Sequence, residues 1–131
     1  MERAAELFAA VQCSVIGLSH IAQPMAWVEF FIWLREKGRA GVFVVGFLSL
    51  GFGCFIVAFH NVWKGLPAVL TFVGWAQVFK GLLYFTAPQI GLRSLKRVAP
   101  ERAGEFVWGG VVLLGLSGLF WYIAFKNLLF T

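Results

Sequence analysis

Four long stretches with almost no charge constrain the fold of this chain more than any other feature. Residues 7–28, 40–63 and 106–125 contain no Asp, Glu, Lys or Arg, and residues 65–92 contain one charge, Lys80. A helix that spans a bilayer needs about 20 mostly apolar residues, so each stretch is long enough to cross once. The stretches do not alternate between polar and apolar residues, which disfavours membrane strands. The sequence therefore predicts an all-α, polytopic membrane protein.

The composition excludes the main alternatives. Of the 131 residues, 60% are apolar, 13% are charged and none is Asp, and the mean hydropathy is +0.83. A soluble domain is about 45–50% apolar and about 25% charged, so this chain has too few polar groups for a soluble enzyme or a disordered protein. The net charge of +5 does not make so apolar a chain a nucleic-acid binder. The length predicts a single membrane domain over residues 1–131.

The predicted spans fall within these stretches, and the first is the least typical. We expect transmembrane helices at about residues 4–23, 41–61, 66–86 and 105–126. The first contains Glu6, Gln12, His20 and Gln23. A signal peptide is the alternative, but Arg3 is offset by Glu2 and Glu6, so the positive charge that precedes such a segment is missing. We therefore predict a span here.

Two connections are predicted to form short amphipathic helices that lie in the membrane interface. They are Pro24–Gly38 and Pro88–Ala99, and each begins with the proline that suits a first helical turn. The apolar face of the first carries Trp27, Phe30, Phe31 and Leu34. In the second, Leu92, Leu95 and Ala99 lie opposite Arg93, Lys96 and Arg97.

The basic residues predict the orientation. These two connections and their flanks hold seven of the eleven Lys and Arg residues: Arg35, Lys37, Arg39, Arg93, Lys96, Arg97 and Arg102. Cytoplasmic loops of membrane proteins carry an excess of Lys and Arg, so we expect both amphipathic helices at the cytoplasmic face of the membrane, against anionic lipid headgroups. Both termini would then lie outside.

An internal repeat relates the two halves, about residues 1–64 and 65–131, at an offset of 64. The order of span, proline, amphipathic helix and span recurs in each half. Among the matching positions are Gly17 with Gly81, Pro24 with Pro88, Gly46 with Gly110 and Gly51 with Gly115. Since each half has two spans, the repeats would be parallel, related by an axis along the membrane normal. Compositional bias is the alternative explanation.

A polar cluster is predicted near the cytoplasmic end of the bundle, from His20, Gln77, Lys80, Tyr84 and Glu105. Lys80 lies eight residues before Pro88, roughly 12 Å along a helix, where an isolated charge is costly. We expect an ion pair with Glu105, with Glu29 or a lipid phosphate as second choices. The cluster is either a functional pocket or a purely structural arrangement in which Lys80 extends toward the membrane surface.

A second candidate site is the turn after the second span, formed by His60, Asn61, Trp63 and Lys64. It is either an outward-facing site or a helix cap with interfacial anchors. We expect no cofactor, metal ion or catalytic residue. His20 and His60 would lie in opposite leaflets, and the two cysteines, Cys13 and Cys54, have no metal-binding spacing.

Three segments together resemble a family of small bacterial inner-membrane proteins of unknown function: GLSHIAQP, the H-N-x-W turn at His60–Trp63 and GWAQVFKG at Gly74–Gly81. The second half also resembles shorter two-span proteins. Neither resemblance implies an activity or a functional residue.

Two functions stay open from the sequence. The first is a non-catalytic membrane subunit or lipid-associated scaffold that works through helix packing. The alternative is a small transporter or channel that forms its pathway by oligomerising. Small residues in the second and fourth spans let membrane helices approach closely, and we expect a homo-oligomer or a larger membrane complex.

Overall fold

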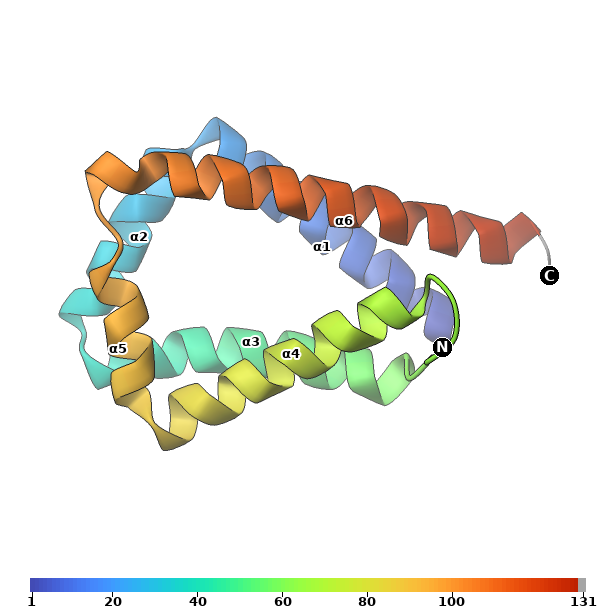
Figure 1. Ribbon diagram of the computed structural model, residues 1–131, viewed down its shortest axis with the longest axis horizontal. Coiled ribbons are helices and arrows are strands. Elements are labelled where there is room, and N and C mark those ends of the chain that lie inside the picture. Colours follow the sequence, from blue (N-terminus) through green and yellow to red (C-terminus); the bar gives the residue numbers. More distant parts are fainter. Residues whose placement is uncertain (130–131) are drawn as a thin grey trace.

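The computed structural model describes residues 1–129, which form helices joined by short connections (Figure 1). The elements are α1 (Glu2–Ala22), α2 (Pro24–Glu36), α3 (Arg39–Phe59), α4 (Ala68–Thr86), α5 (Pro88–Lys96), the short 3-10 helix η1 (Pro100–Arg102) and α6 (Ala103–Leu129). Within these residues there is no strand. Four segments are long and apolar enough to cross a membrane: α1, α3, α4 and Pro100–Lys126. The predicted all-α polytopic fold is confirmed, and each predicted span coincides with one of these segments to within a few residues.

The four long helices are arranged as two pairs. α1 lies along α6, and α3 lies along α4. The pairs meet near the N-terminus and the turn between α3 and α4, and they diverge toward α2 and α5 (Figure 1). We call these two ends of the molecule the closed end and the wide end. Each pair takes one helix from each half of the predicted repeat, so the two halves interlock rather than form separate bundles.

Glycine residues let the helices of each pair approach closely. A Cβ placed on Gly17 of α1 would lie 3.0 Å from the carbonyl oxygen of Gly110 of α6. A Cβ placed on Gly81 of α4 would lie 3.3 Å from the carbonyl oxygen of Gly46 of α3. At the offset of 64, Gly81 corresponds to Gly17 and Gly46 corresponds to Gly110. The two contacts are therefore formed by equivalent positions in the two halves. The repeat stays a prediction, and this recurrence supports it.

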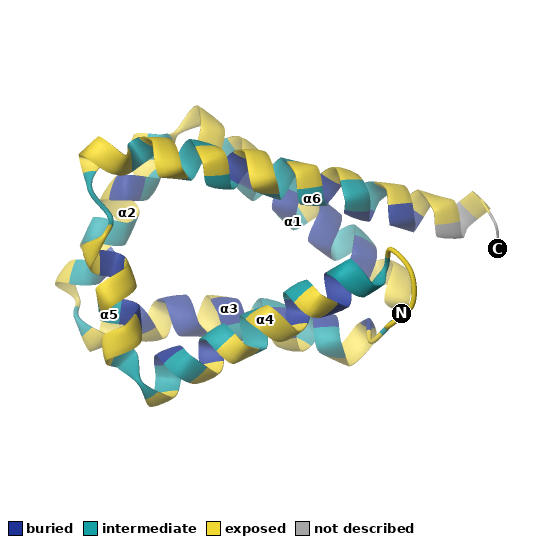
Figure 2. Cartoon of the chain, in the orientation of Figure 1, coloured by how far each residue is buried: buried dark blue, intermediate teal, exposed yellow. Residues whose placement is uncertain are grey.

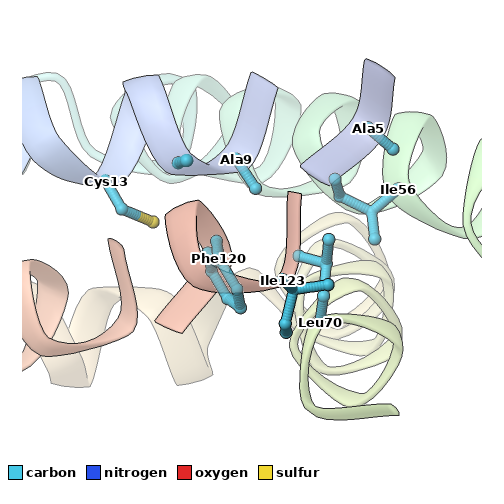
Figure 3. Close-up of a cluster of buried hydrophobic side chains, with 8 residues drawn as sticks. Ala5, Ala9, Cys13, Ile56, Leu70, Phe120 and Ile123 are labelled. Carbon is cyan, nitrogen blue, oxygen red and sulfur yellow. The ribbon is translucent and has the colours of Figure 1, made fainter. Parts of the chain in front are cut away.

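Buried apolar side chains form a separate cluster at each end. At the closed end, α1, α3, α4 and α6 all contribute (Figure 3): the cluster includes Ala5, Ala9, Cys13, Ile56, Leu70, Phe120 and Ile123. At the wide end, α2 and α5 join the α3/α4 pair through Leu34, Val42, Val45, Tyr84 and Leu95. The first cluster holds the two pairs together, and the second attaches the short helices to one of them.

Exposed residues occur along all four long helices (Figure 2), and many of them are large and apolar. Among those exposed are Phe72, Phe79, Leu82, Trp108, Val112 and Phe125. A soluble monomer rarely exposes so continuous an apolar surface, whereas a lipid-facing surface requires one. Tryptophans are exposed toward both ends, with Trp63 in the turn at the closed end and Trp33 in α2 at the wide end. This distribution matches the aromatic belts of membrane proteins.

The two short helices form where they were predicted, although the buried face of α2 differs in part. Both begin with proline in their first turn. α2 buries Val28 and Leu34, while Phe30, expected on the apolar face, is 37% exposed. α2 is apolar on most sides, so its contacts with α3 and α6, rather than its own periodicity, decide which side is buried. α5 buries Leu95 and exposes its basic residues, as predicted.

Candidate functional site

A cleft lies between the two helix pairs. One cavity of about 650 Å³ is lined by residues of α1, α2, α3, α4 and α6. A second, of about 350 Å³, shares part of its lining with the first: Gln12, Ile16, Phe52, Gln77 and Leu113. We call the two together the interpair cleft. Its walls are mainly aromatic and aliphatic, and its polar lining residues are Gln12, His20, Ser49, Gln77 and Lys80. Mostly apolar walls with a few polar groups are typical of small-molecule sites.

Lys80 is the charged residue of this lining. Its side chain is partly buried, and its ammonium nitrogen lies 5.5 Å from the centroid of the Tyr84 ring, one helical turn further along α4. Tyr84 is itself buried in the cluster at the wide end. The ring faces the ammonium, and such a cation–π contact offsets part of the cost of a partly buried charge.

The predicted ion pair between Lys80 and Glu105 is not formed. Among the described side chains, the carboxylate of Glu105 pairs instead with Arg97 at 3.5 Å and Arg102 at 4.0 Å. Both arginines lie in the connection that leads into α6, next to Glu105 in the sequence, whereas Lys80 lies on α4 in the other helix pair. The prediction was based on depth along the helices and did not take into account the arginines that lie close to Glu105 in the sequence.

His20 lies at the border between the interpair cleft and a neighbouring cavity of about 440 Å³ at the wide end. Its ring stacks on Trp27 with centroids 4.1 Å apart, and its Nδ1 lies 2.8 Å from the carbonyl oxygen of Ile16. Glu105 also lines this neighbouring cavity. The five residues of the predicted cluster therefore do not form one site. The cleft is lined by His20, Gln77 and Lys80. Tyr84 contacts Lys80 without lining the cleft, and Glu105 lines the neighbouring cavity.

A buried polar network at the closed end joins the two helix pairs. Nε2 of His60 lies 3.1 Å from Oε1 of Glu6 in α1, and Nδ1 of His60 lies 3.1 Å from Oγ1 of Thr71 in α4. The three side chains are at most 1% exposed. The Thr71 hydroxyl donates to the carbonyl of Val62 at 2.7 Å and accepts from the N–H of Val62 at 3.1 Å. We call Glu6, His60 and Thr71 the buried triad.

The interpretation of His60 as part of an outward-facing site is wrong, since its ring is fully buried. α3 ends at Phe59, and the chain turns His60 inward between α1 and α4. The other three residues of the predicted turn, Asn61, Trp63 and Lys64, are exposed. Trp63 contacts Phe72 edge-on at 5.4 Å, so this part of the turn is an aromatic anchor.

Sequence reasoning did not single out Glu6, Thr71 or Gln12 as site residues. A signal for the triad is present in the sequence. Glu6 is an acidic residue inside a predicted span, and His60 ends the next one, which runs in the opposite direction. Both groups therefore had to lie at the same end of the bundle.

The described residues contain no group of three or more His, Cys, Asp or Glu side chains placed to hold a metal ion. The comparisons with known proteins return no match: no family model, no curated protein and no solved structure is similar to this chain. The resemblance to small bacterial inner-membrane proteins stays a prediction.

Proposed function

We propose that this chain is a non-catalytic membrane protein that holds the hydrocarbon chain of a lipid in the interpair cleft and acts as a lipid-associated scaffold or subunit. The observation that carries the proposal is a cleft with apolar walls between helices long enough to span a bilayer. At that depth the surrounding medium is hydrocarbon. An acyl chain can lie against the apolar part of these walls without burying a polar group of its own, whereas water or a polar solute there would lose hydrogen bonds.

Two glycines offer a matched test of the cleft. Gly51 of α3 lines it, and a Cβ placed there would have no neighbour within 4 Å. Gly115 of α6 has the same free space, but it is not among the lining residues of the cleft. Gly51→Phe should fill the cleft and reduce the amount of lipid retained after purification, as quantified by mass spectrometry. Gly115→Phe should retain as much as the wild type. Equal retention by both variants would refute the proposal.

We also propose that α2 and α5 lie at the cytoplasmic face of a bacterial inner membrane, with both termini outside. The support is the concentration of basic residues at the wide end. Single cysteines at Ser94 and Lys64, both exposed, should react with an impermeant thiol reagent from opposite sides when Cys13 and Cys54 are replaced by Ala. Labelling of both from one side would contradict this orientation.

A homo-oligomer or a larger membrane complex remains part of the proposal. Sizing the protein in native-lipid particles tests it. A monodisperse monomer without any co-purifying chain would contradict it.

A small transporter is the second candidate, favoured by the asymmetry of the cleft. The two helix pairs diverge at the wide end, and at the closed end Glu6 meets His60 and Phe8 meets Phe55 with centroids 4.4 Å apart. A transporter must open such a closure during its cycle. A cysteine replacing Ala9, which is fully buried there, would become reactive from the side of the termini in a transporter and stay protected in a scaffold.

A further inference from the structure

We infer that the lipid held in the interpair cleft carries an acidic group, a carboxylate or a phosphate, and that Lys80 binds it. This inference rests on the proposed function and specifies the chemical class of the ligand. It starts from the charge of the cleft. Its lining includes Lys80 and no Asp or Glu.

Two carboxylates that could have paired with Lys80 contact other residues instead. Glu6 lies against His60 at the closed end, and Glu105 pairs with the arginines beside the neighbouring cavity. The described contact of the Lys80 ammonium is the ring of Tyr84. A ring face attracts a cation without accepting its N–H hydrogen bonds in the way an oxygen does, so the donors of Lys80 are available to a ligand.

The depth of Lys80 suits the head of a lipid rather than its tail. Lys80 precedes Thr86, the last residue of α4, by six residues, or roughly 9 Å at 1.5 Å per residue. The acidic group would therefore lie a short distance below the wide end, and the chain would extend toward Phe8, Phe52 and Phe55, which line the cleft further toward the closed end.

Two amides of the lining can support the same group. Gln77 lies three residues before Lys80, so both occupy one side of α4, and Gln12 lines the cleft from α1. Their side-chain N–H groups can donate hydrogen bonds to an oxyanion. The same hydrogen bonds would be weaker to a neutral alcohol, and a cationic head group would not accept them. The cleft is therefore selective for the charge of the head group.

The test compares palmitate, hexadecyl phosphate and hexadecanol, which share one chain length, for binding to the purified full-length protein. The wild type should bind the two acids at least about tenfold more tightly than the alcohol, as expected for a charge-assisted interaction. Lys80→Met should lose this preference and still bind hexadecanol. Lys80→Arg should keep it, and so should Lys64→Met, which removes an exposed lysine outside the cleft.

The inference is overturned if the wild type shows no preference for the acids, whatever the variants do, or if Lys80→Met keeps the preference. It is also overturned if Arg97→Gln rather than Lys80→Met abolishes it, since the acid would then bind in the neighbouring cavity. Gly51→Phe separates the two proposals: if it leaves hexadecanol binding unchanged, the lipid-holding function fails. If it blocks hexadecanol but the wild type does not favour acids, only the role of Lys80 fails. The relative affinities of palmitate and the phosphate then assign the head group.

Discussion

The polar side chains at the two ends of the molecule differ in burial and in their partners. At the closed end, His60 binds both Glu6 and Thr71 and so joins the two helix pairs, and all three side chains are almost fully buried. At the wide end, Lys80 faces an aromatic ring in a cleft, and Glu105 pairs with arginines in the open. Polar side chains that hydrogen-bond to each other inside an apolar bundle fix its arrangement. Lys80, whose ammonium faces an aromatic ring, can still donate hydrogen bonds to a ligand. The comparison predicts where substitutions affect stability and where they affect binding.

The largest effect on stability is expected at the buried triad. His60→Ala removes the imidazole that contacts both Glu6 and Thr71 and breaks the polar link between the two helix pairs in an apolar core, which should cost about 3 kcal/mol. Thermal unfolding in mild detergent measures this loss. Asn61→Ala is the control, because Asn61 is exposed and makes one long contact, 3.5 Å, with Trp75. A similar melting temperature for both variants would show that the triad does not hold the pairs together.

The second largest effect is expected within the α3/α4 pair. A Cβ on Gly53 would lie 2.6 Å from the backbone nitrogen of Val78 and 2.7 Å from the carbonyl oxygen of Gly74. Gly53→Ala must therefore separate the two helices, at a cost of about 1–3 kcal/mol. Gly51→Ala, two residues earlier with no neighbour within 4 Å, should be neutral or slightly stabilising. Unfolding curves of the two variants decide the matter, and matching curves would mean that this close approach is not required.

A smaller effect is expected where α2 meets α5. The guanidinium of Arg35 donates to the carbonyl oxygen of Leu95, in the last turn of α5, at 3.4 Å and to that of Val98, just after α5, at 2.9 Å. Arg35→Gln should cost about 1 kcal/mol and increase hydrogen exchange in α5 more than in α1. Arg93→Gln, on the exposed side of α5, should leave the exchange unchanged. Unaltered exchange in the Arg35 variant would contradict the proposed link.

The smallest effect is expected at Glu105, because its side chain is 57% exposed and its arginine partners are exposed as well. Glu105→Gln should cost at most about 0.5 kcal/mol, and added salt should reduce even this difference by screening the wild-type pairs. Unfolding at low and high salt measures both. A large, salt-independent loss would mean that Glu105 has a partner deeper in the molecule.

The sequence was sufficient for the elements and insufficient for their pairing. The thickness of a bilayer sets the length of an apolar helix, so the charge-free stretches located all four spans. Proline at Pro24 and Pro88 located the two short helices for a similarly local reason. The pairing of α1 with α6 depends on how Gly17 and Gly110 meet, and these residues are separated by most of the chain. Local patterns do not report such contacts.

The candidate sites show the same limit. Lys80 and Gln77 share a helix face, which periodicity reveals, and both line the cleft. The predicted ion pair between Lys80 and Glu105 was wrong, because the two residues lie in different helix pairs and the sequence does not give the distance between the pairs. The turn at His60 was expected either to face outward or to cap the helix. His60 does cap α3, but its burial could not be predicted, because it depends on Glu6 and Thr71, which belong to two other helices.

The pairing of α1 with α6 has a consequence for the order in which the chain is made. The main neighbour of α1 is α6, which follows it much later in the chain, so α1 is synthesised about a hundred residues before α6 is complete. During that interval the contacts of His60 with Glu6 and Thr71 form once α3 and α4 have followed. Assembly is therefore completed only when α6 inserts beside α1, and a chain that stops before α6 leaves α1 without its main neighbour.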